Sequence, residues 1–161
     1  MPDQVSVTRE VDASAAEVWA MVSDITRMGE WSPENEGARW TGGATGPRPG
    51  AGFRGVNRKG SRTWRTAGRV VASDPGRLFS FRITVLGLPS SEWQYHVEST
   101  AGGCRVTETW GDQRGTVVRL LGRLVTGVDH DAAYTRDGME QTLEHLKAAA
   151  EAGRHRGDSL P

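Results

Sequence analysis

The residues of this sequence best suited to chemistry are three polar side chains that the local pattern places among apolar ones. Glu108 and Asn57 alternate in phase with aromatic residues of the same region, so both are predicted to point into the interior of a sheet. Glu34 comes directly after Trp31-Ser-Pro and is predicted to border the same interior space. These side chains are candidates for orienting a polar group of a ligand.

Glu108 is also the one candidate for catalysis. A carboxyl group in an apolar pocket has a raised pKa unless it is paired, and a raised pKa suits general acid or base work. The alternative is a structural role, in which Glu108 bonds to Asn57 or to an arginine within an internal network. The sequence leaves both interpretations open.

The sequence patterns that could indicate a cofactor or a metal ion lack the neighbouring elements or the ligand spacing that such sites require. Residues 50–55 match the G-x-G-x-x-G dinucleotide fingerprint, but a strand pattern follows them where the fingerprint requires a helix. His130 and His145 are predicted on the outer side of the last helix, and no two histidines share ligand spacing with a carboxylate. Cys104, the single cysteine, is predicted to be a small core residue. We therefore expect no cofactor and no metal.

Two periodicities define the elements that must position these side chains. Residues 5–12 alternate as a strand does, and Ser14-Ala-Ala-Glu17 has the capping-box pattern that begins an amphipathic helix over 14–23. A further helical turn is predicted from Ile25 to Trp31, before Ser-Pro stops it. Between residues 36 and 110 the pattern is almost entirely strand-like, with turns at glycine and proline clusters.

After Gly115 the apolar period returns to 3.6 residues. An apolar stripe from Val117 to Leu146 predicts one long helix that ends near Gly153, a natural C-cap. The order of elements predicts an α+β domain, because clustered strands joined by short turns form an antiparallel sheet. The long helix has to bury its stripe on that sheet, and a wide sheet curls. A curled sheet under a straight helix encloses space, so we predict a pocket.

Aromatic residues on the inward parity suit the walls of such a pocket, and apolar residues of the long helix suit its roof. Because this surface is largely apolar, we expect a small or medium apolar ligand that binds mainly through burial of its own surface. The residues predicted to contact it are Trp31, Glu34, Trp40, Phe53, Asn57, Trp64, Phe81, Trp93, Tyr95, Glu108, Trp110, Leu121, Leu124 and Val128.

Three segments of the chain resemble a known family: residues 5–19, with Val-x-Val and the capping box; Trp31-Ser-Pro-Glu34; and Met139–Lys147 in the last helix. Together they resemble the START-like (SRPBCC) superfamily, and more narrowly its polyketide cyclase/dehydrase-like branch, over about residues 4–150. The resemblance implies a helix-grip fold, with about seven strands wrapped around a long C-terminal helix and two short helices between strands 1 and 2. Since the helical pattern ends at Gly153, we expect one such domain over residues 1–153, followed by a disordered tail over 154–161.

Charge is unevenly distributed although the whole chain has a formal net charge of zero. Residues 37–82 contain ten lysines and arginines and one acid, a net of +9. Much of this charge shares the outward strand parity, and the alternatives are a solvated face paired with Glu92 and Glu98 or a docking surface for an acidic protein. The arginines concerned are Arg54, Arg58, Arg65, Arg69 and Arg82.

The overall composition excludes other classes of partner. Outward aromatic residues that would stack on bases are missing from the arginine stripe, so nucleic acid is not expected. No apolar run approaches the length of a membrane span, so we expect no membrane insertion and a cytoplasmic protein.

Function is then predicted as binding of a hydrophobic molecule such as a lipid, a polyketide or an aromatic metabolite. The first alternative is a polyketide cyclase or aromatase that works without metal or nucleotide, in which an enclosed cavity folds the substrate and Glu108 moves a proton. The second alternative is a protein-interaction module that uses the arginine face.

Overall fold

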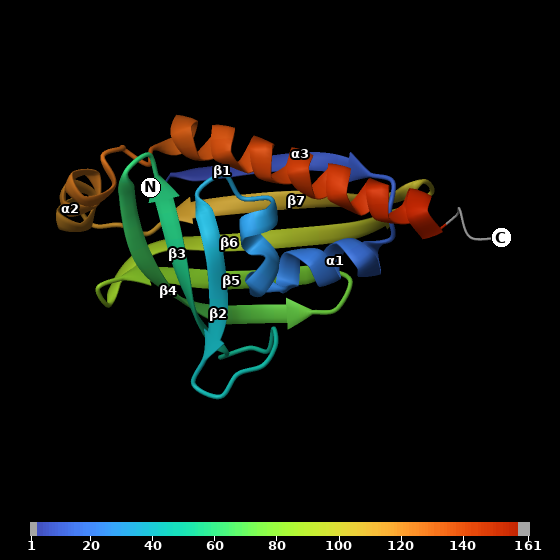
Figure 1. Cartoon of the computed structure of the whole chain (residues 1–161), viewed down its shortest axis with the longest axis horizontal. Coiled ribbons are helices and arrows are strands. Elements are labelled where there is room, and N and C mark those ends of the chain that lie inside the picture. Colours follow the sequence, from blue (N-terminus) through green and yellow to red (C-terminus); the bar gives the residue numbers. More distant parts are fainter. Residues whose placement is uncertain (1–2, 158–161) are drawn as a thin grey trace.

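The computed structural model describes residues 3–157, which form one antiparallel sheet of seven strands with helices against its concave face (Figure 1). The strands lie in the order β1-β7-β6-β5-β4-β3-β2. The elements, in chain order, are β1 (Gln4–Val11), α1 (Ala15–Ser23), the 3-10 helix η1 (Ile25–Glu30), β2 (Asn35–Thr41), β3 (Gly52–Lys59), β4 (Arg62–Asp74), β5 (Leu78–Val85), β6 (Leu88–Thr100), β7 (Gly103–Asp112), α2 (Thr116–Thr126) and α3 (Ala132–Gly157).

The two short helices between the first strands form as predicted. The Ser14 hydroxyl accepts a hydrogen bond from the backbone N–H of Glu17, and the Glu17 carboxylate accepts one from the backbone N–H of Ser14. This reciprocal capping box satisfies donors that a helix start leaves unpaired. Since β1 and β2 lie at opposite edges of the sheet, α1 and η1 carry the chain from one edge to the other.

The core lies where the C-terminal helix and α1 meet the sheet. α3 packs along β1, and its buried face carries Met139, Leu143, Leu146 and Ala150. Met139, Leu143 and Leu146 belong to the apolar stripe that the sequence pattern identifies, and Ala150 extends it by one turn. The predicted helix-grip arrangement of a curved sheet and a long C-terminal helix is confirmed.

The prediction of a single helix after Gly115 is wrong, because the chain breaks into α2 and α3. Gly127 adopts a left-handed conformation, with φ of 77°, and its N–H donates to the carbonyl of Arg123 to end α2. Asp131 then accepts a hydrogen bond from the backbone N–H of Tyr134 at 2.8 Å, at the start of α3. A C-terminal glycine and an N-terminal aspartate are ordinary stop and start signals, and they override the continuous apolar period.

The end of α3 also differs from the prediction. The helix continues past Gly153 to Gly157, and Arg154 forms an ion pair with Asp12, which follows β1. Residues 154–157 are therefore helical rather than part of a tail, and residues 158–161 of the predicted tail lie outside the described residues. None of the helices within residues 3–157 combines the length and the apolar character needed to cross a bilayer.

Candidate ligand-binding cavity

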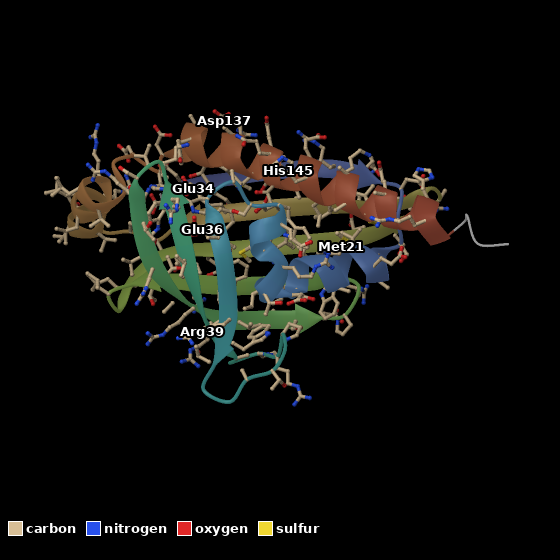
Figure 2. All side chains as sticks on the ribbon, viewed as in Figure 1. Met21, Glu34, Glu36, Arg39, Asp137 and His145 are labelled. Carbon is tan, nitrogen blue, oxygen red and sulfur yellow. The ribbon has the colours of Figure 1, made fainter. Side chains whose placement is uncertain are left out.

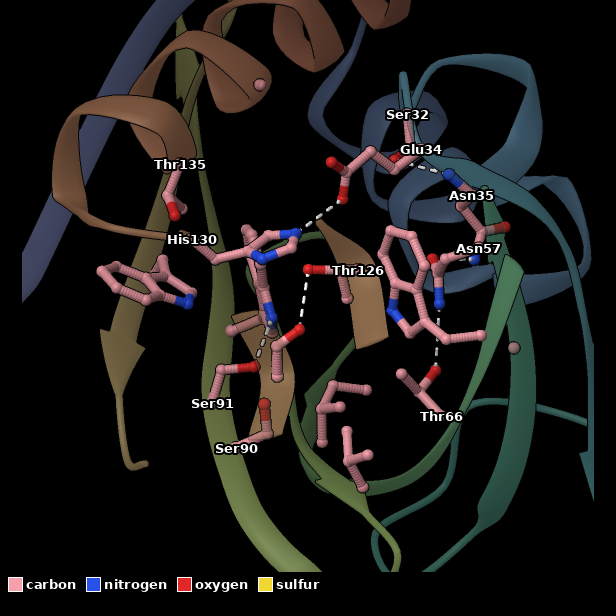
Figure 3. A pocket seen from close by; sticks show the side chains of 18 of the residues that line it. Ser32, Glu34, Asn35, Asn57, Thr66, Ser90, Ser91, Thr126, His130 and Thr135 are labelled. Atoms are coloured by element: carbon pink, nitrogen blue, oxygen red, sulfur yellow. Dashed lines mark hydrogen bonds and ion pairs between the residues drawn. The ribbon is translucent and has the colours of Figure 1, made fainter. Parts of the chain in front are cut away.

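A cavity of about 280 Å³ lies between the concave face of the sheet and the helices α2 and α3 (Figure 3). This volume is close to the lower end of ligand pockets, roughly 300 Å³. Aromatic side chains from five strands make up much of its wall, namely Phe53, Trp64, Phe81, Trp93, Tyr95 and Trp110. The strand register explains the clustering, since Trp93 faces Trp110 and Phe81 faces Trp93 in adjacent strands.

The structure brings most of the residues proposed from the sequence to this wall. Besides the six aromatic residues, they are Glu34, Asn57, Glu108 and Leu121. Four residues do not line the cavity, each for its own reason. Trp31 is 2% exposed within the core, under the guanidinium of Arg27, and Trp40 packs edge-on behind Phe53 with ring centroids 6.0 Å apart. Leu124 is 67% exposed on the outer side of α2, and Val128 lies in the link between α2 and α3.

One glycine decides how Phe53 enters the wall. Gly68 pairs with Phe53 across β3 and β4, and the Phe53 ring lies over the position that a Cβ at residue 68 would occupy, at 2.1 Å. No side chain other than hydrogen fits beneath this ring. The ring also makes an edge contact with Phe81, with centroids 5.4 Å apart. Gly68 therefore lets the Phe53 ring lie against β4, where it forms part of the cavity wall.

The deepest polar group of the wall is Glu108 on β7. Its side chain is fully buried, and the Tyr95 hydroxyl on β6 donates a hydrogen bond to its Oε1 at 2.7 Å. The two residues are direct cross-strand partners. The other carboxyl oxygen, Oε2, is buried and has no hydrogen-bond partner in the described residues. Neither Asn57 nor an arginine among residues 3–157 bonds Glu108, so the partners named for an internal network are wrong, and the observed partner is Tyr95.

Burial controls the ionisation of Glu108. Loss of solvation raises the pKa of this carboxyl to about 8, and the hydrogen bond from Tyr95 offsets only part of that rise. Glu108 is consequently a neutral acid at pH 7. Tyr95 responds in the same direction, since burial and the neighbouring carboxyl raise the pKa of its hydroxyl well above the ordinary value.

A second carboxyl group, that of Glu34, lies on the rim of the cavity, and its pKa is shifted in the opposite direction. Glu34 accepts a hydrogen bond from Tyr134 and lies 3.3 Å from Nε2 of His130, the contact drawn as a dashed line in Figure 3. Burial alone would raise the pKa of Glu34, but the two hydrogen bonds, together with the charges of His130 and Lys59, leave the pKa below its ordinary value. In the view of all side chains, Glu34 precedes β2 at the end nearest α3, whereas Arg39 lies toward the other end of that strand (Figure 2).

The sequence analysis did not predict that His130 lines the cavity or that Tyr134 packs beside it. His130 lies in the link between α2 and α3 rather than on the outer side of a helix, and its ring contacts Trp64 edge-on, with centroids 5.8 Å apart. Tyr134 packs against that ring and holds Lys59 over its own face at 5.2 Å. The sequence contains a signal for this position of His130, namely a helix stop at Gly127 and a helix start at Asp131. The link between these two residues turns His130 inward.

Amide groups line the side of the cavity near β3. The Asn35 amide donates to Asn57 Oδ1 at 3.3 Å, and the Asn57 amide donates to the Thr66 hydroxyl at 3.4 Å. Asn57 thus faces the cavity as predicted by its parity, but its amide is engaged by neighbours from β2 and β4.

Exposed apolar residues surround the mouth of the cavity. Leu121 and Val125 of α2 line it and are also about half exposed, at 46% and 52%. Opposite them is the tight turn between β5 and β6, where Leu86 is 91% exposed and has φ of 52°. Figure 1 places α2 and this turn at the same end of the molecule. The apolar wall of the cavity therefore continues to the surface between these two elements.

An ion-pair cluster anchors α2 beside the cavity. Asp112, at the end of β7, accepts hydrogen bonds from Nε and Nη2 of Arg114, each at 2.9 Å, and from Arg119 of α2 at 2.7 Å. Arg114 also donates to the backbone carbonyl of His130 at 2.6 Å. The cluster joins the sheet, α2 and the link that carries His130.

The outward arginines lie on the convex side of the sheet, and several have partners within the chain. Arg58 pairs with Glu36, Arg82 pairs with Glu92 at 2.9 Å, and Arg69 donates to the carbonyl of Gly50. The pairing with Glu92 is the one expected for a solvated face. Docking of an acidic protein at Arg54, Arg58, Arg65 and Arg69 stays a prediction.

Comparison with known proteins identifies the class to which this fold and cavity belong. A family described as "Polyketide cyclase / dehydrase and lipid transport" matches residues 2–151. The chain belongs to this family, and the predicted START-like membership is confirmed. A search of curated proteins found no match.

Solved structures share the fold. The polyketide-cyclase-like protein Cgl2372 from Corynebacterium glutamicum is 27% identical, with a TM-score of 0.64 over 100% of this chain and 99% of that one. Protein CV1439 from Chromobacterium violaceum is 14% identical, with a TM-score of 0.71 over 93% and 99% of the two chains. The di-domain ARO/CYC BexL from the BE-7585A biosynthetic pathway is 18% identical, with a TM-score of 0.69. The match covers 93% of this chain and 50% of BexL.

Proposed function

We propose that this protein binds a small or medium apolar molecule in the cavity between the sheet and the helices. The observation that carries the proposal is the cavity itself, about 280 Å³ with a wall of aromatic side chains and a few convergent polar groups. This combination is the usual composition of a small-molecule site. Membership of a family described by cyclisation, dehydration and lipid transport supports it.

Binding energy would come mainly from removal of apolar surface from water. A ligand that buries about 250 Å² gains roughly 6 kcal/mol at about 25 cal/mol per Å², before the cost of immobilising it. Such a molecule enters between α2 and the turn between β5 and β6, where the wall is exposed.

Two measurements test the proposal. Native mass spectrometry of protein purified from its own host is expected to show a mass increment that organic extraction removes. In addition, the neutral dye N-phenyl-1-naphthylamine is expected to bind with a blue-shifted emission. Leu121→Ser removes an apolar group from the cavity wall and should weaken dye binding several-fold, whereas Leu120→Ser changes the outer side of the same helix and should leave binding unchanged. Equal dye binding by the two variants, or none by the native protein, would contradict the proposal.

A second function, cyclase or aromatase catalysis, is favoured by the opposite ionisation of the two carboxyl groups. Glu108 stays protonated at neutral pH while Glu34 is ionised, and both face the cavity. Environments that push two pKa values apart are typical of acid–base pairs. In this function Glu108 donates a proton to a carbonyl oxygen of a folded polyketide-like chain, and the BexL likeness supports it at the level of the fold.

Glu108→Gln separates the two functions. If the protein is a catalyst, the variant loses turnover of a poly-β-ketone thioester analogue and largely keeps its affinity for it. If the protein only binds, no turnover accompanies binding in either form. Product analysis by liquid chromatography distinguishes these outcomes.

A further inference from the structure

The Tyr95–Glu108 pair holds one hydrogen-bond donor more than it can use internally. In its neutral form the pair has two hydroxyl protons and makes one hydrogen bond, between the Tyr95 oxygen and Glu108 Oε1. Whichever group donates in that bond, one proton is left without an acceptor. In the observed arrangement the remaining donor is at Oε2 of Glu108, a residue that lines the cavity, and this oxygen is buried and has no hydrogen-bond partner in the described residues.

Other groups on the wall are already committed to partners. The charged or titratable ones are Glu34 before β2, Arg114 after β7 and His130 before α3. Arg114 is bonded to Asp112 and to a backbone carbonyl, and His130 and Glu34 face each other. Within the part of the chain that the structure describes, Glu108 therefore has no cation to stabilise an ionised form and no acceptor to satisfy its protonated form.

We propose that the Tyr95–Glu108 pair selects ligands that place a neutral carbonyl oxygen against Glu108 Oε2, and that it rejects carboxylates of the same shape. This inference rests on the proposed binding function and names the ligand class that the cavity takes. A carbonyl oxygen accepts the spare proton and completes the hydrogen bonding of the pair.

Competing ligand classes are each penalised for a physical reason. A hydrocarbon of the same size has no acceptor for the Glu108 proton. It leaves that donor unpaired, or it displaces a water molecule that would have accepted the proton, so its complex lacks a hydrogen bond that the ketone complex contains. A carboxylate brings a negative charge into an apolar space that offers no uncommitted cation, and its desolvation is not repaid. The cavity therefore discriminates against free fatty or aromatic acids.

Three naphthalene derivatives of matched shape test the inference at pH 6.5. They are 2-acetylnaphthalene, 2-ethylnaphthalene and 2-naphthoate, each used to displace N-phenyl-1-naphthylamine. The ketone is expected to displace the dye at about tenfold lower concentration than either competitor, since one hydrogen bond to a buried group is at stake.

Variants at residue 108 assign this preference to the carboxyl group. Glu108→Gln keeps an N–H donor beside Tyr95 and should retain the preference for the ketone, whereas Glu108→Met has no donor and should bind the ketone and the hydrocarbon equally. Ionisation of Glu108 removes the donor, and because burial raises its pKa to about 8, the native preference should decline above pH 8. The glutamine variant should show no such decline, which keeps the test available if the methionine variant does not fold.

The outcomes separate this inference from the proposed function. If the dye binds but the ketone shows no advantage over the hydrocarbon, or naphthoate competes as well as the ketone, the selection is refuted and binding in the cavity stands. If the dye does not bind at all, both are refuted.

Discussion

Glu108 shows how one residue acquires its character from its neighbours. Its strand parity predicts an inward side chain, and the structure places it fully buried opposite Tyr95. Burial there favours the protonated form of the carboxyl group, because no basic side chain within residues 3–157 bonds it. Glu34, a few residues after η1, has the same chemistry but lies beside His130 and Tyr134 and stays ionised.

The raised pKa of Glu108 predicts how stability depends on pH. The folded protein binds this proton more tightly than the unfolded chain, in which the carboxyl has its ordinary pKa of 4.5. As pH rises from about 4.5 through about 8, the unfolded chain ionises first, so the contribution of Glu108 to the free energy of unfolding falls.

Urea unfolding of the native protein and of Glu108→Gln measures this effect. The glutamine variant should gain stability relative to the native protein between pH 5 and 9, by a few kcal/mol at about 1.4 kcal/mol per unit of pKa difference. Parallel stability curves for the two proteins across this range would show that Glu108 is not held neutral.

At the scale of the elements, the break between α2 and α3 creates the site as much as the sheet does. A continuous helix would direct His130 to solvent, whereas the left-handed Gly127 ends α2 and lets the link carry His130 to Trp64 and Glu34. The two helices consequently have different tasks. α3 packs on β1 and builds the core, while α2 forms the side of the cavity nearest its mouth.

Packing between β3 and β4 predicts a sharp effect of one methyl group. Gly68→Ala places a Cβ where the Phe53 ring lies, so the ring must move toward the cavity. We expect a loss of about 1–3 kcal/mol in the free energy of unfolding, together with weaker binding of N-phenyl-1-naphthylamine.

Gly111→Ala is the matched control, because a Cβ at this position on β7 meets no atom within 4 Å. Both substitutions reduce the freedom of the unfolded chain alike. Thermal unfolding and dye titration of the two variants should therefore differ. Equal behaviour would show that Phe53 is not held against Gly68.

At the scale of the whole molecule, the Asp112 cluster connects parts that are distant along the chain. The Asp112 side chain is 1% exposed and that of Arg114 is 10% exposed, and together with Arg119 they join the end of the sheet to α2 and to the link that follows it. Burial alone would raise the pKa of Asp112, but the hydrogen bonds from Arg114 and the charges of both arginines hold it below the ordinary value.

Asp112→Asn is expected to lower the free energy of unfolding at pH 7 by roughly 3 kcal/mol, because it leaves the buried Arg114 without a counter-charge. A depressed pKa stabilises the fold above the unfolded value and loses that contribution as pH falls through the folded one. The difference between native and variant should therefore shrink below about pH 4.

Glu92→Gln provides the control, since it breaks an ion pair with Arg82 whose side chains are 36% and 59% exposed. An exposed pair of this kind contributes less than about 1 kcal/mol. Chemical denaturation of both variants compares the two sites, and a loss at Asp112 no larger than that at Glu92 would contradict the role given to the cluster.

The fold of this protein could be predicted from the sequence because its signals are local. Alternation in the segments that became β5, β6 and β7 indicates strands and their inner faces, and the Ser14–Glu17 capping box marks the start of α1. A side chain's parity follows from the pleat of its own strand, so inward positions such as Glu108 and Trp110 were identified without any tertiary information.

What only the tertiary structure decided is which inward side chains meet. The pairing of Glu108 with Tyr95 depends on the register between β6 and β7, and the contact of Glu34 with His130 depends on the path of a link 96 residues away in the chain. Similarly, Trp31 and Trp40 are aromatic like the residues of the cavity wall but do not line the cavity. The position of each ring in the core depends on the packing of several elements, which the sequence pattern of one element does not contain. Local periodicity specifies the direction of a side chain, whereas its partner and its ionisation follow from packing between distant segments.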